Sequence, residues 1–79
     1  MTDITQRPLG KHMVAFQHAD HPDVWVIKSK HGDVLGGIEY YPSWRQYEFF
    51  PAESTMFSWD CLQALSAFLQ ELSAKRRGK

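Results

Sequence analysis

The sequence has only one cysteine in 79 residues, Cys61. A single cysteine excludes an intramolecular disulfide and a zinc site built on several cysteines. No apolar run approaches the roughly eighteen residues of a membrane-spanning helix, and the first twenty residues contain no continuous apolar segment typical of a secretory signal peptide. We therefore expect a protein of the reducing cytoplasm that has no association with a membrane.

An excess of charge of one sign is also absent, because nine basic residues balance nine acidic ones. A chain that binds polyanions usually carries a basic excess, so nucleic acid is not the first partner that this composition indicates. No catalytic or cofactor motif is recognisable either. The sequence therefore predicts a protein that is not an enzyme and has no cofactor.

Aromatic residues, in contrast, are abundant at 14% of the chain. Most of them lie in residues 34–51, which we interpret as two strands joined by a tight turn. A chain of this length forms one small domain, which buries a modest fraction of its surface. Large aromatic side chains are one way for such a domain to gain buried area per residue.

The spacing of apolar residues predicts up to four strands followed by one helix. The expected strands cover residues 11–18, 24–30, 34–41 and 44–50, and the helix begins after the N-cap residue Ser58. Because the connections between strands are short, the strands must run antiparallel. We therefore expect an α+β fold, with a three- to four-stranded antiparallel meander sheet and one C-terminal α-helix on one face.

The domain boundaries follow from the same pattern. Residues 1–10 are expected to form a disordered N-terminal tail, residues 11–74 a single ββββα domain, and residues 75–79 a basic C-terminal tail. Whether residues 11–18 pair with the sheet stays open.

Alternation along each strand assigns the side chains to two faces. Gly36 and Gly37 indicate a bulge, a sharp twist or room for a bulky neighbour. The residues expected to form the core are Phe16, Trp25, Ile27, Ile38, Tyr40, Tyr47, Phe49, Leu62, Leu65, Phe68, Leu69 and Leu72.

The opposite face of the sheet is the first candidate site. It is expected to carry Val24, Val26, Lys28, Lys30, Glu39, Tyr41, Trp44, Gln46, Glu48 and Phe50. Such a mixture suits a protein interface, with Tyr41, Trp44 and Arg45 as anchors and Lys28 and Lys30 at the rim. Gln46 and Glu48 complete the predicted binding residues.

Two alternative roles for this face stay open. Aromatic residues beside basic ones can also bind nucleic acid, with the basic C-terminus adding a nonspecific contact. The same residues can instead only pair across strands and stabilise the sheet. An unpaired outer strand would allow a weak edge-to-edge dimer, so the chain is expected to be a monomer or such a dimer.

Two further features are better assigned to ordinary structural roles. His18, Asp20, His21 and Asp23 could hold a divalent metal, together with His12 or His31, but their pattern is also that of a solvated turn. We therefore assign no metal site. Cys61 lies in the first turn of the helix, where a thiolate would be stabilised, yet no motif supplies a base, and it continues the apolar stripe as a small buried residue.

Several segments together carry a resemblance to a known group of proteins. They are Trp25–Lys30, Gly32–Gly36, Tyr40-Tyr41, Trp44–Tyr47, Phe49–Pro51, Cys61-Leu62 and Phe68-Leu69. Over about residues 24–72 the sequence resembles short uncharacterised proteins encoded in phage and prophage genomes. The resemblance implies a small ββββα or βββα domain, located in the host cytoplasm if the chain is phage-encoded. It implies no activity and assigns no functional residue.

Overall fold

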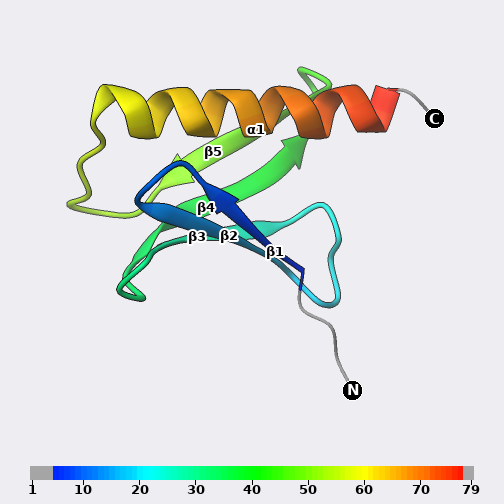
Figure 1. Ribbon diagram of the computed structural model, residues 1–79. Coiled ribbons are helices and arrows are strands. Elements are labelled where there is room, and N and C mark those ends of the chain that lie inside the picture. Colours follow the sequence, from blue (N-terminus) through cyan, green and yellow to red (C-terminus); the bar gives the residue numbers. More distant parts are fainter. Residues whose placement is uncertain (1–4, 78–79) are drawn as a thin grey trace.

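The computed structural model describes residues 5–77, which form one antiparallel sheet and one helix (Figure 1). The elements are β1 (Gln6–Leu9), β2 (Met13–Gln17), β3 (Trp25–Ser29), β4 (Val34–Tyr41), β5 (Gln46–Pro51) and α1 (Trp59–Arg77). The strand order is β1-β2-β3-β4-β5, so each strand pairs with the next along the chain. The expected α+β meander with one C-terminal helix is therefore confirmed, although the sheet has five strands.

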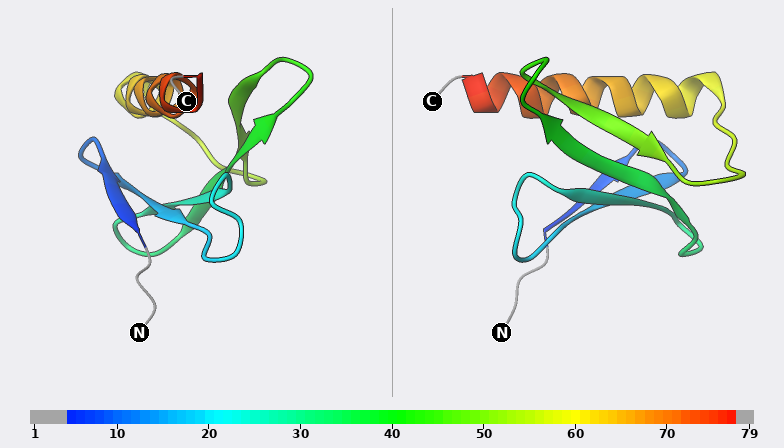
Figure 2. Two further views of the ribbon diagram at one scale, coloured as in Figure 1. Left: turned by 90° about the vertical axis from the view of Figure 1, so that its right-hand side faces the viewer. Right: turned by 180° about the vertical axis from the view of Figure 1, so that it is seen from behind.

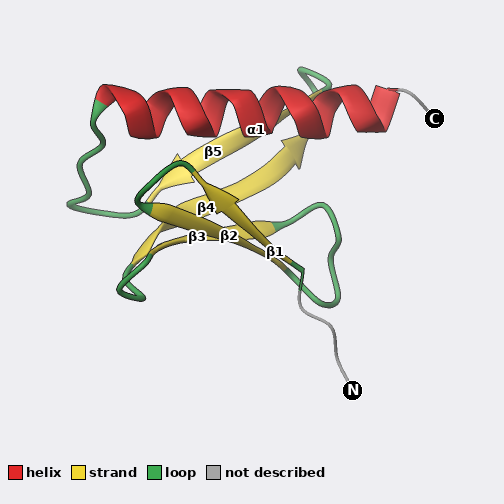
Figure 3. Cartoon of the chain, viewed as in Figure 1, coloured by secondary structure: helices red, strands yellow, loops and turns green. Residues whose placement is uncertain are grey.

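The helix lies along one side of the sheet, which curves around it (Figure 2). Both edge strands, β1 and β5, contact α1. No described element covers the opposite side of the sheet (Figure 3). Within residues 5–77, no helix has the length and apolar character needed to span a bilayer.

The additional strand, β1, corrects the prediction of a tail over residues 1–10. Its register with β2 runs from Gln6 opposite Phe16 to Leu9 opposite Met13. The segment has no apolar alternation, but Leu9 is buried in the core, and Gly10 forms the turn with a φ of 64°. Tertiary contacts, including the burial of Leu9, thus stabilise a strand that its local sequence does not indicate. Residues 1–4 lie outside the described residues.

The C-terminal boundary also differs from the prediction. The helix continues through Lys75 and Arg76 to Arg77, so these residues do not form a tail. Basic residues in the last turn of a helix complement the partial negative charge of its terminal carbonyl groups. Residues 78–79 of the predicted tail lie outside the described residues.

The side chains of β2 face the opposite way to the prediction. Met13 and Ala15 are buried, whereas Val14 and Phe16 are half-buried on the side away from α1. This short strand is apolar on both faces, so alternation alone does not identify the core side. The register with β3 decides it, since Ala15 lies opposite the buried Ile27.

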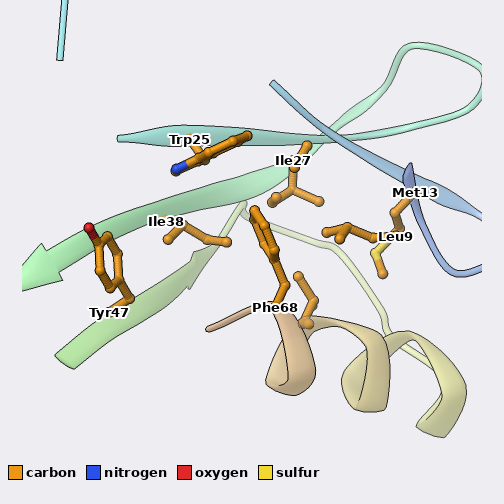
Figure 4. Packing of buried hydrophobic residues seen from close by; sticks show 9 residues of the cluster. Leu9, Met13, Trp25, Ile27, Ile38, Tyr47 and Phe68 are labelled. Atoms are coloured by element: carbon orange, nitrogen blue, oxygen red, sulfur yellow. The ribbon is translucent and has the colours of Figure 1, made fainter. Parts of the chain in front are cut away.

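The core lies between α1 and the middle of the sheet (Figure 4). Its buried residues are Leu9, Met13, Ala15, Trp25, Ile27, Ile38, Tyr47, Leu65 and Phe68. The Phe68 ring meets Trp25 edge-on, with ring centroids 5.1 Å apart. Tyr40, Phe49, Leu69 and Leu72 are half-buried against this cluster, as the sequence predicts, whereas Phe16 and Leu62 are not part of it.

Two neighbouring glycines in β4 have different surroundings. A Cβ atom on Gly36 would lie 2.5 Å from the carbonyl oxygen of Phe50 and 2.7 Å from the Phe49 ring. On Gly37 the nearest atom would be 3.5 Å away. The β3–β4 register also shifts beside Gly36, because Ile27 pairs with Gly36 and Lys28 with Val34. Gly36 thus provides room for a bulky neighbour, and a β-bulge adjoins it.

An ion pair joins β1 to the helix. The Arg7 guanidinium donates two hydrogen bonds to the Glu71 carboxylate, at 2.7 and 2.6 Å. These bonds are the main reason why the pKa of Glu71 lies below its ordinary value of 4.5. Because the folded-state pKa is lowered, the pair stabilises the fold above that value, and this contribution is lost as pH falls through the folded-state pKa.

We expect Arg7→Gln to raise the pKa of Glu71 toward 4.5, because the variant removes both charge-assisted hydrogen bonds. A titration of the Glu71 side-chain carboxyl carbon by NMR measures this pKa directly. Lys75→Gln is the control, since Lys75 is farther from the carboxylate, at 3.6 Å, and its side chain is 72% exposed. An identical midpoint in wild type and Arg7→Gln would contradict the assignment.

Candidate functional site

Apolar side chains gather on the uncovered side of the sheet. In one cross-strand row, Phe16 lies opposite Val26, Val26 opposite Gly37, and Gly37 opposite Phe50. In the next row, Val14 lies opposite Lys28 and Lys28 opposite Val34. We call the five apolar side chains in these rows the open-face patch: Val14, Phe16, Val26, Val34 and Phe50.

The open-face patch is accessible although no single member is fully exposed. Val34 is 54% and Phe50 48% exposed, and the other three members are half-buried by their neighbours. Gly37 stands between Val26 and Phe50 and contributes no side chain, so no side chain projects from the sheet surface at this position of the row. The Lys28 ammonium lies 5.4 Å from the centroid of the Phe16 ring, a cation–π contact, and Lys28 itself stands between Val14 and Val34 in the second row.

Two carboxylates lie beside the patch toward the β4–β5 hairpin. Glu39 of β4 is directly opposite Glu48 of β5, and both alternate away from the core. Like charges in opposed positions destabilise a sheet. Among the side chains that the structure describes, no cation forms an ion pair with either carboxylate. The pair therefore leaves a local negative charge on this face.

The predicted anchors Trp44 and Arg45 do not belong to a strand, because β5 begins at Gln46. They lie in the turn after β4, where the Trp44 amide donates to the Tyr41 carbonyl at 3.2 Å. Arg45 adopts a φ of 54°, a left-handed conformation that closes the turn. The exposed rings of Tyr41 and Trp44 meet edge-on at 5.2 Å.

The predicted binding residues thus form two separate groups. Tyr41, Trp44, Arg45, Gln46 and Glu48 gather around the β4–β5 hairpin. Lys28 and Lys30 lie at the other end of β4, Lys28 opposite its first residue and Lys30 in the preceding turn. Seven steps of about 3.3 Å along a strand separate these ends by roughly 23 Å, so the lysines do not border the aromatic anchors.

Sequence reasoning missed the centre of this surface. Phe16 is predicted to face the core, and Val26 and Phe50 are predicted to lie on the open face but are not among the predicted binding residues. The available signal was the presence of apolar residues on both faces of the first predicted strand. An antiparallel strand that is covered on only one face usually carries polar residues on the other face, so packing within the domain does not explain the apolar residues on both faces.

The histidine-rich turn has a structural role. Both carboxylate oxygens of Asp23 are engaged, one by the Tyr47 hydroxyl at 2.6 Å and the other by Arg76 at 2.8 Å. Burial and the hydrogen bond to Asp23 raise the pKa of Tyr47. The turn between β2 and β3 is thereby fixed to β5 and α1, and no group of three metal-ligating side chains occurs in the described part of the chain.

Cys61 packs at the margin of the core, where it is half-buried. Its Sγ atom lies 3.3 Å from the Ser58 hydroxyl at the start of α1. This placement agrees with a small apolar residue of the helix stripe.

These features define a class: a small α+β domain with a five-stranded antiparallel meander, which its C-terminal helix covers on one face and which carries an apolar patch on the other. Comparisons with protein-family models, with curated proteins and with solved structures found no match. The resemblance to short phage and prophage proteins therefore stays a prediction.

Proposed function

We propose that this protein is a non-enzymatic module that binds a partner protein through the open face of its sheet. The observation that supports the proposal is the open-face patch, which spans four neighbouring strands from β2 to β5. An antiparallel sheet with one solvated face normally places polar residues there. A contiguous apolar surface on a small domain instead favours a role in binding.

The residues beside the patch indicate the chemistry of the partner. The Glu39–Glu48 carboxylate pair favours a lysine or arginine on the opposing surface, which would also relieve the repulsion between the two carboxylates. The exposed pair of Tyr41 and Trp44 adds large amphipathic side chains of the kind that dominate binding energies at interfaces. We therefore expect an apolar partner surface that carries a basic residue at its margin.

The charges on this face favour a protein over nucleic acid. Lys28 and Lys30 lie at one end of β4 and Arg45 at the other, while Glu39 and Glu48 lie between them. A phosphate backbone that crossed the face would meet these carboxylates. Nucleic-acid binding normally uses a clustered basic patch or stripe instead.

Photo-crosslinking tests the proposal. With p-benzoylphenylalanine in place of Phe50, we expect a discrete protein adduct in an extract of the source cells, unchanged by nuclease. Adding Val34→Lys should reduce the adduct at least tenfold, because it places a charge in the patch at a position already 54% exposed. The same crosslinker in place of Met56, which is 93% exposed outside the face, is the matched control.

The possible outcomes separate the hypotheses. An adduct that disappears with nuclease would favour the nucleic-acid alternative. No adduct, or an adduct of equal yield with Val34→Lys, would contradict protein binding through this face.

A further inference from the structure

The open face carries opposite charges on the two sides of its apolar centre. One cross-strand row passes through this centre, and we call it the central row: Phe16, Val26, Gly37 and Phe50. Lys28 lies two residues from Val26 along β3, and Glu39 lies two residues from Gly37 along β4 in the opposite direction. Two residues of a strand span about 7 Å, so the ammonium and the carboxylate stand at similar distances on either side of the central row.

This arrangement is complementary to itself under a two-fold rotation. When two sheets pack face to face about 10 Å apart, a two-fold axis that runs between them along the central row reverses the direction of the strands. The Lys28 side of each copy then lies over the Glu39 side of the other, and the two central rows face each other. Packed sheets normally cross at about −30°, and this rotation carries Lys28 toward β4 of the other copy, the strand that contains Glu39.

A second copy also has the chemistry that the open face requires of its partner. Glu39 and Glu48 lie opposite each other and favour a basic residue on the facing surface, whereas the open-face patch favours an apolar one. Each copy of the chain presents both, because Lys28 stands between Val14 and Val34. The formal net charge of the chain is zero, so no overall repulsion opposes the approach of two copies.

The curvature of the sheet determines which strands meet first. The sheet curves around α1, so the open face is convex (Figure 2). Two convex faces touch along their middle strands before their edges. β3 is the middle strand of the five and β4 is its neighbour. Because these two strands carry Lys28 and Glu39, the charged residues lie within the area of contact.

We propose that two copies of this chain form a two-fold symmetric dimer through their open faces. The inference rests on the proposed function and names the partner protein as a second copy of the chain. The apolar side chains of the two patches pack against each other, and Lys28 of each copy pairs with Glu39 and Glu48 of the other. Every contact occurs twice in such a dimer, and each lysine relieves the repulsion between two carboxylates.

Sedimentation equilibrium of the full chain between about 1 μM and about 1 mM tests the proposal. We expect a reversible equilibrium between monomer and dimer. Lys28→Glu and Glu39→Lys should each raise the dissociation constant of the dimer at least tenfold, because either change places two like-charged contacts in the symmetric interface. Neither residue belongs to the core, so circular dichroism should show that both variants fold.

An equimolar mixture of the two variants is the more specific measurement. In the mixed dimer the introduced carboxylate faces the introduced ammonium, and the remaining Lys28 faces the remaining Glu39. Mixing should therefore restore association to within about threefold of wild type. With one variant labelled with nitrogen-15, native mass spectrometry should show the mixed dimer in excess of both symmetric ones.

A pair of charge changes elsewhere on the surface is the matched control. Lys11 lies in the turn between β1 and β2, and Glu53 lies in the connection from β5 to α1, and both are exposed. Lys11→Glu and Glu53→Lys, alone or mixed, should dimerise as wild type does.

The outcomes separate this inference from the proposed function. A chain that stays monomeric to about 1 mM would overturn the inference. So would a dimer that the changes at Lys28 and Glu39 leave unaltered, or one that mixing does not restore. If the chain is monomeric but the crosslinker in place of Phe50 still gives an adduct with another protein, the proposed function stands and only self-association is contradicted. A monomeric chain that gives no adduct would contradict both.

Discussion

Replacing Leu65 by alanine is expected to lower the free energy of unfolding by about 2–5 kcal/mol, the range for a buried leucine. Leu65 is only 2% exposed and belongs to the core between α1 and the sheet. A small domain has a total stability of about 5–15 kcal/mol, so this loss is a large fraction of it. Urea denaturation followed by far-ultraviolet circular dichroism measures the difference.

Leu62→Ala is the matched control for Leu65→Ala. Both leucines are on α1, and the sequence assigns both to the core. Because Leu62 is 52% exposed, the variant should lose no more than about 1 kcal/mol. Equal losses in the two variants would contradict the orientation of the helix against the sheet.

Gly36→Ala should destabilise the fold by at least about 2 kcal/mol, although it adds a single methyl group. The new Cβ atom would lie 2.5 Å from the backbone oxygen of Phe50, so a side-chain rotation cannot relieve the contact. Neither Gly36 nor Gly37 has a positive φ, so the effect arises from this close approach alone. Thermal unfolding of the variant should show a midpoint lowered by at least about 8 °C.

Gly37→Ala provides the comparison within the same strand. Its Cβ atom would meet only the Trp25 carbonyl oxygen, at 3.5 Å, an ordinary contact. We expect the free energy of unfolding to change by no more than about 1 kcal/mol, because glycine loses more backbone entropy on folding than alanine and this offsets the new contact. A loss as large as that of Gly36→Ala would contradict the packing described at the β4–β5 pair.

The sequence predicted the elements whose local patterns are strong. The alternation in residues 34–41 gave the bounds of β4, and the apolar stripe after Ser58 gave the start of α1. The assignment of Tyr47 and Phe49 to the helix side is confirmed. The sequence could predict it because the polar residues Gln46 and Glu48 alternate with these two aromatic residues. The short segment before β2 carried no such pattern, so β1 was missed.

The sequence by itself determined that this chain forms a small α+β domain with an antiparallel meander, because short connections and periodic apolar residues permit little else. Tertiary structure alone decided which side of β2 is buried, that Leu62 is half exposed, and that Lys28 lies far from Trp44. These features depend on strand register and helix rotation. Both are set by contacts between residues distant in the chain, which no local pattern records.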